Sequence, residues 1–178
     1  MSSHTRPVTR LSISIPGTFE DAVDTFETAV PHVNGAEFAA AVERGWGDAA
    51  AIAENAPHSF LIYWKNDVRP LMGAAGDTHS AIAYLMGNHV VAERMFRHEP
   101  RVMNYAPLRV ELSQITGQPV QFSADVPSDN FGSFGIPEVT AVGYELDAHL
   151  ADLIETIGGT VPQELIDRAP SASEAADG

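Results

Sequence analysis

Alternating hydrophobic and polar positions predict strands at the start of the chain and in its second half. In residues 8–15 the apolar side chains of Leu11, Ile13 and Ile15 alternate with polar ones, which is the period of a strand buried on one face. Residues 107–114 and 120–126 alternate in the same way and are separated by a Thr-Gly-Gln segment at residues 116–118. Residues of these types favour a turn, so the two segments predict an antiparallel hairpin.

Two continuous apolar runs predict further strands. Residues 58–65 contain Phe, Leu, Ile, Tyr and Trp in succession, which is too apolar for a surface strand and too short for a helix. We expect this strand to be buried on both faces and to lie centrally in the sheet. Residues 79–86 form a second short run, after which Gly87 and Asn88 predict a tight turn into a helix over residues 89–98.

Spacings of three and four residues between apolar positions predict the helices. Thr18 is a typical N-cap, and the apolar positions that follow predict a helix that ends at Pro31. Residues 38–42 and 49–53 are alanine-rich and predict two short helices with a Gly-Trp-Gly break between them. The most regular helical pattern covers residues 137–157.

The order of the predicted elements favours an α+β fold. Strands and helices do not alternate cleanly, no segment repeats, and the segments around Pro70 and over residues 128–135 indicate loops. We predict a single domain over residues 8–158, with a mostly antiparallel sheet that carries helices on one face. Residues 1–7 are expected to form a flexible N-terminus and residues 159–178 a mobile tail, because few apolar residues occur there.

Charge and composition narrow the class of partner. The chain has 178 residues, with 10 Lys and Arg against 24 Asp and Glu, and a formal net charge of −14. Such a surface repels nucleic-acid phosphates and anionic lipid, so neither nucleic acid nor membrane is an expected partner. The absence of cysteine excludes disulfides, thiolate metal sites and cysteine nucleophiles. No segment has the character of a signal peptide or transmembrane helix, which predicts a cytoplasmic location.

The densest group of chemically useful side chains lies between Tyr84 and Arg109. His89 follows the predicted turn at a helix start, where free backbone amides attract an anion and a neutral imidazole is able to ligate a metal or haem iron. His89 and Glu93 lie four residues apart on this helix and form a candidate acid–base pair. His89 is the candidate metal ligand, and the candidate cofactor-binding residues are His89, Met95, Tyr84, Phe96, Arg97, Tyr105 and Arg109.

Each of these features also has a purely structural interpretation. Asn88 is a typical N-cap, His89 is then a first-turn residue, and Met95 is then part of the core. A basic cluster in the same segment either clamps a carboxylate, a phosphate or haem propionates, or stabilises a helix C-terminus; its members are Arg94, Arg97, His98 and Arg101. The chain contains no serine-protease triad order, phosphate-binding glycine loop, zinc-protease motif or dinucleotide fingerprint.

Three segments give the chain a family resemblance: Tyr-Leu-Met-Gly-Asn-His at residues 84–89, Ala-Glu-Arg-Met-Phe-Arg-His-Glu-Pro at 92–100 and Tyr-Ala-Pro-Leu-Arg at 105–109. Over roughly residues 8–157 the sequence resembles the bacterial and archaeal domain of unknown function 302 (DUF302) family. The resemblance implies a small α+β fold, self-association and a ligand-binding face near the helix after the central strand. It implies no reaction. Many relatives carry a cysteine before this helix, and its absence here argues against a thiol-based role.

Three functions follow as hypotheses. The first is a small-ligand-binding domain, with haem as the candidate cofactor and His89 as its axial ligand. The second is a cofactor-free enzyme that uses His89 and Glu93 for acid–base chemistry. The third is a homodimeric interaction module whose interface is a sheet edge or the region around Trp46.

Overall fold

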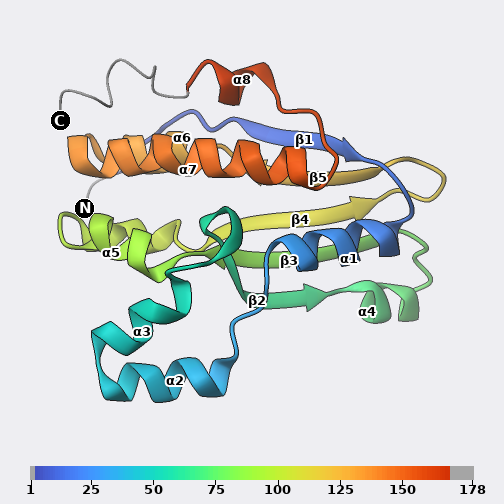
Figure 1. Ribbon diagram of the computed structural model, residues 1–178. Coiled ribbons are helices and arrows are strands. Elements are labelled where there is room, and N and C mark those ends of the chain that lie inside the picture. The colour runs from blue at the N-terminus through green and yellow to red at the C-terminus, as the bar shows by residue number, and fades with distance from the viewer. Residues whose placement is uncertain (1–2, 169–178) are drawn as a thin grey trace.

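A five-stranded sheet carries its long helices on one face (Figure 1). The computed structural model describes residues 3–168, which form one domain. The strand order is β1-β5-β4-β3-β2, and every neighbouring pair is antiparallel. The predicted α+β class, with a mostly antiparallel sheet and helices on one face, is therefore confirmed. The strands are β1 (Arg10–Ile15), β2 (Leu61–Asp67), β3 (Ser80–Gly87), β4 (Leu108–Gln114) and β5 (Val120–Asp125).

Side-chain alternation divides the sheet into a core face and an open face. On β1, β3, β4 and β5 every second side chain is buried under the helices, as Ile13, Ile82, Leu112 and Phe122 illustrate. The intervening side chains are exposed or half-buried and define what we call the open face. Its members on β3, β4 and β5 are Ala81, Ala83, Leu85, Arg109, Glu111, Ser113, Gln121, Ser123 and Asp125.

Helices α1 (Phe19–Ala29) and α7 (Pro137–Thr156) confirm the two longest helix predictions. Thr18 caps α1 because its hydroxyl accepts from the Asp21 amide, while the Asp21 carboxylate accepts from the Thr18 amide at 3.0 Å. The other helices are α2 (Gly35–Arg44), α3 (Trp46–Ala53), α4 (Arg69–Ala74), α5 (His89–Phe96), α6 (Pro127–Phe131) and α8 (Gln163–Ile166). Short 3-10 turns cover Pro57–Ser59 (η1), Pro100–Asn104 (η2) and Gly132–Phe134 (η3).

The prediction of a central strand in residues 58–65 is wrong. β2 is the last strand in the order and pairs with β3 alone among the five strands, whereas β4 is central. Ile62 packs into the core and Leu61 is buried as well, whereas Trp64, beyond a bulge, is 49% exposed on the face opposite to Ile62. An apolar run is therefore compatible with a strand at the edge of the sheet.

Short helices also occupy segments that the sequence indicated as loops or tail. α4 lies in the segment around Pro70, and α6 begins at Pro127 and continues into residues 128–135, each with proline in its first turn. α8 lies within the predicted tail, where Leu165 is buried in the core. The end of the predicted tail, residues 169–178, is outside the described residues, as are residues 1–2. Within residues 3–168, no helix is both long and apolar enough to cross a membrane.

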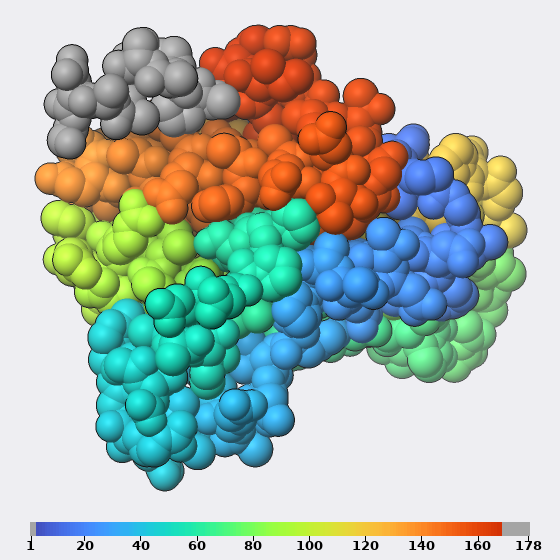
Figure 2. Space-filling view, viewed as in Figure 1, coloured from blue at the N-terminus to red at the C-terminus, as the bar shows by residue number. Residues whose placement is uncertain are grey.

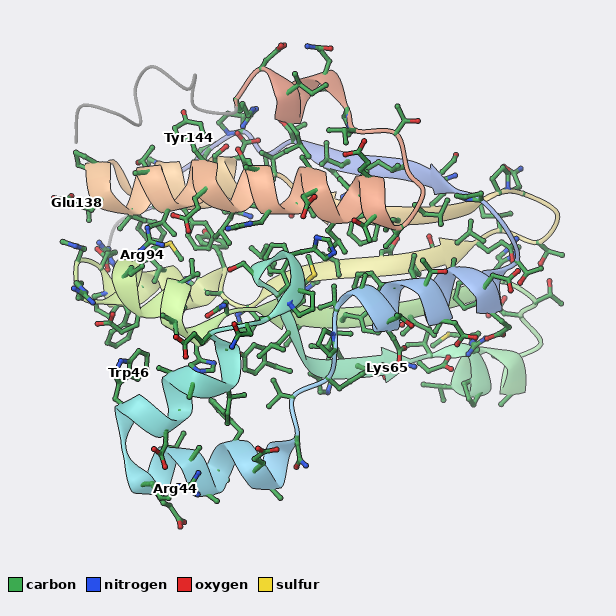
Figure 3. The ribbon with its side chains drawn as sticks, viewed as in Figure 1. Arg44, Trp46, Lys65, Arg94, Glu138 and Tyr144 are labelled. Carbon is green, nitrogen blue, oxygen red and sulfur yellow. The ribbon has the colours of Figure 1, made fainter. Side chains whose placement is uncertain are left out.

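Helices α2 and α3 form a two-helix unit that projects from the body of the molecule (Figure 2). They extend beyond the predicted ranges 38–42 and 49–53, and the buried side chains they contribute are alanines. Trp46, at the turn between them, extends toward α5 (Figure 3). This two-helix unit therefore contacts the rest of the domain largely at the start of α5.

Candidate functional site

His89, the first residue of α5, has hydrogen-bond partners on both ring nitrogens. Nε2 lies 2.6 Å from the carbonyl oxygen of Ala49 in α3, and Nδ1 lies 2.7 Å from the hydroxyl of Tyr63 in β2. Because a carbonyl oxygen only accepts, Nε2 must donate, and in the neutral ring Nδ1 accepts from Tyr63. Burial raises the pKa of Tyr63, which keeps its hydroxyl a donor. Both nitrogens are thus used within the protein.

Three aromatic rings surround the His89 imidazole. The ring centroids of Phe38, Trp46 and Tyr63 lie 5.0, 6.1 and 6.2 Å from that of His89. Phe38 and Trp46 come from α2 and α3, so the rings and the Ala49 hydrogen bond together hold the projecting unit against α5. This arrangement gives His89 a structural role in positioning α2 and α3.

Asn88 caps α5, as its structural interpretation predicts. Its side-chain oxygen accepts from the amides of Val90 and Val91, and its Nδ2 donates to the Ala53 carbonyl at 3.3 Å. The turn between β3 and α5 is therefore also tied to α3.

An apolar pocket of about 220 Å³ lies beside His89. We call it the α5 pocket. Its polar edge is formed by Tyr63, Asn88 and His89. Its walls come from α5, η2, β4, α6 and α7, and the larger apolar side chains are Met95, Met103, Leu108, Phe131 and Leu146. A concave apolar cavity with a few polar groups at one edge is the usual form of a small-molecule site.

The predicted cofactor-binding residues do not converge on one site. His89 and Met95 line the α5 pocket.

Tyr84 is buried beneath α1, where its hydroxyl donates to Glu27 at 2.8 Å. Burial, together with the Glu27 carboxylate, raises the pKa of Tyr84. Phe96 and Arg97 are exposed, whereas Tyr105 and Arg109 line a separate groove on the open face.

Glu93 and the basic cluster are engaged in ion pairs. Glu93 accepts from Arg97 one turn along α5, so the predicted pair with His89 is not brought together. Arg94 donates two hydrogen bonds to Glu145 of α7, at 2.8 and 2.7 Å. Three of the four residues of the basic cluster, Arg94, Arg97 and Arg101, therefore have carboxylate partners. The hydrogen bonds from Arg101 lower the pKa of Glu99 to about 2.

The histidines among residues 3–168 do not gather into a metal site. Within residues 3–168, no group of three or more His, Cys, Asp or Glu side chains is placed to hold a metal ion. His79 lies 3.2 Å from the Thr116 hydroxyl, and His98 is exposed, so neither joins His89.

The residues around His89 also do not fit a haem. To coordinate the haem iron, a ring nitrogen of His89 would have to lose its hydrogen bond to Tyr63 or to the Ala49 carbonyl. The α5 pocket, at about 220 Å³, is smaller than the roughly 300–1,000 Å³ of sites for drug-sized ligands.

Several residues of this site were not predicted from the sequence. Tyr63 and Ala49 lie 26 and 40 residues from His89, and Phe131 comes from a segment that indicated a loop. One signal was present in the apolar run of residues 58–65, because a tyrosine in a buried strand needs a partner for its hydroxyl.

A larger groove of about 670 Å³ lies on the open face, and we call it the open-face groove. The small side chains of Ala83 and Ser123 line it beside Arg109. Tyr105 forms part of its wall, and the Arg6 guanidinium lies 4.6 Å from the centre of the Tyr105 ring. This cavity falls within the usual size range of ligand sites.

The structure is an α+β domain whose sheet is covered by helices on one face, with cavities of about 220 and 670 Å³. Among solved structures, the chain is similar to an uncharacterised conserved DUF302 protein from Bacillus stearothermophilus, with a TM-score of 0.60 and 12% sequence identity. The likeness covers 83% of this chain and 97% of that one. The expected DUF302-like fold is therefore confirmed, and at this identity the likeness concerns the fold alone. No protein-family model and no curated protein matches the chain.

Proposed function

We propose that the protein binds a small apolar molecule in the α5 pocket. The observation that carries the proposal is the composition of the pocket, whose walls are almost entirely aliphatic, aromatic and thioether side chains with polar atoms at one edge. An apolar cavity of about 150 Å³ is sufficient to bind benzene in another protein. The volume of about 220 Å³ therefore favours a ligand of about one ring.

His89 has a positioning role in this proposal. Its hydrogen bonds hold Tyr63 and α3 at the polar edge of the pocket, and the edge supplies the few directional contacts that orient a ligand. Two methionines, Met95 and Met103, lie in the walls. Because a thioether side chain is flexible and polarisable, it adapts to ligands of different outline.

Filling the pocket is expected to abolish most of the binding. Toluene titrated into the protein should shift the NMR signals of residues around Met95, Phe131 and Leu146. The Ala92→Phe variant places a ring inside the pocket wall, and we expect at least about a tenfold loss of toluene affinity, or about 1.4 kcal/mol.

Ala141→Phe is the matched control, because Ala141 is exposed on α7 and lines neither cavity. It should bind toluene as the unmodified protein does. Equal binding by both variants, or no saturable binding by the unmodified chain, would contradict the proposal. A haemin titration tests the competing hypothesis that His89 ligates haem. A Soret band that appears with the unmodified protein and disappears in His89→Ala would favour haem ligation over an apolar ligand.

A further inference from the structure

The open-face groove gathers three arginines in a chain whose formal net charge is −14. Arg6 comes from the N-terminal segment, Arg10 from β1 and Arg109 from β4. Arg10 Nε lies 3.7 Å from a carboxylate oxygen of Asp125, and Arg6 donates to a backbone carbonyl at 3.4 Å. Arg109 forms no ion pair or side-chain hydrogen bond with residues 3–168. One guanidinium in the groove is therefore available to an anion.

Asn130 of α6 lines the same groove and is 7% exposed. Its backbone carbonyl accepts from the Ser133 hydroxyl, but its side-chain amide has no hydrogen-bond partner in the described part of the chain. The residue as a whole is buried, but its amide atoms are not among the fully enclosed unpartnered polar atoms of residues 3–168, so they are in contact with solvent. This amide is therefore a second group, besides the Arg109 guanidinium, that is open to a polar ligand in the groove.

We infer that the open-face groove binds a small molecule that carries one carboxylate on an apolar body. The Arg109 guanidinium offers two parallel N–H donors, which match the two oxygens of a carboxylate. The Asn130 amide is placed to hydrogen-bond a further polar atom of the ligand. Ala83 and Leu85 of β3 supply the apolar surface for the ligand body.

The charges in the groove favour a monoanion. Three arginines face two carboxylates, those of Glu111 and Asp125, which leaves one net positive charge. A phosphate ester carries a charge of roughly −1.5 to −2 near neutral pH and would meet repulsion from both acids. A single carboxylate matches the net charge.

This inference does not rest on the proposed function. The groove and the α5 pocket share lining residues in the segment 103–108, but neither Arg109 nor Asn130 lines the pocket. A variant that fills the pocket therefore tests one site without removing the charged groups of the other.

Naphthoate and its uncharged amide, naphthamide, provide the test, because they share one ring system and differ in charge. In NMR titrations we expect naphthoate to bind at least about tenfold more tightly than naphthamide and to move the side-chain amide signals of Asn130. Arg109→Gln should remove this preference. The control Arg44→Gln should retain it, since Arg44 is an exposed residue of α2 that lies far from the sheet (Figure 3). Ala92→Phe should also retain it, whatever that variant does to toluene binding.

Equal affinity for the two probes would overturn the inference, as would a preference that survives in Arg109→Gln. Inorganic phosphate binding more tightly than naphthoate would overturn the assignment to a carboxylate. Loss of toluene binding in Ala92→Phe with naphthoate binding unchanged would support both sites separately.

Discussion

Replacing Phe26 by alanine is expected to lower the free energy of unfolding by about 3–5 kcal/mol. The side chain is fully buried on α1, and its ring centroid lies 4.8 Å from that of Tyr84 and 5.8 Å from that of Phe122. These rings join α1 to β3 and β5, so the truncation removes contacts between three elements. Urea unfolding measures the loss as a lower midpoint. A change of this size is a large part of the roughly 5–15 kcal/mol that stabilises a typical domain.

Phe96→Ala is the matched control for Phe26→Ala. It is the same substitution on a helix, but Phe96 is 49% exposed on α5. Substitutions at exposed sites usually change stability by about 0.5 kcal/mol or less, so we expect a far smaller shift. Comparable losses in the two variants would show that the ring cluster around Phe26 does not hold α1 on the sheet.

Elements whose burial follows a local period could be predicted from the sequence. The β4–β5 hairpin and α7 agree with prediction because each turns one face to the core, which makes its alternation or helical spacing visible. The position of β2 could not be predicted in the same way. Strand order depends on contacts between distant segments, and Ile62 is buried without β2 having a second neighbouring strand. α4 and α6 are too short to show a period.

The candidate site shows the same division between local and distant information. His89 was found because it follows the Gly87–Asn88 turn, which is a local feature. Its role was not predicted, since a histidine that ligates a metal and one that bridges a tyrosine and a carbonyl look alike in sequence. The distinction depends on Tyr63 and Ala49, which the fold brings to the ring from β2 and α3. The unpartnered Asn130 amide is likewise visible only once α6 is placed beside the sheet.

Asp147 of α7 is an acid buried completely within the fold. One carboxylate oxygen accepts from the Ser128 amide at 2.9 Å, and the other has no hydrogen-bond partner among residues 3–168. Burial raises the pKa of Asp147 above its ordinary value, and the negative charge of Asp129 acts in the same direction. The Ser128 hydrogen bonds and the positive charge of Arg168 oppose this shift without reversing it.

Asp147→Asn is expected to become more stable than the unmodified protein as the pH rises. With a raised pKa in the fold, the folded chain keeps its proton at pH values where the unfolded chain has lost it. The contribution of Asp147 is thus fully present below the unfolded pKa of about 3.9 and is lost as the pH rises through the folded pKa. Asparagine resembles the protonated acid and cannot ionise. The stability difference should grow by at most about 1.4 kcal/mol per pH unit within that window.

Urea unfolding of both proteins between about pH 4 and about pH 8 measures this difference. Asp24→Asn is the control, because it removes the same formal charge from an exposed position on α1. A stability difference for Asp147→Asn that stays constant with pH would mean that Asp147 is ionised in the fold throughout this range. Arg168 would then outweigh burial, and removing its charge with Arg168→Gln should restore the pH dependence.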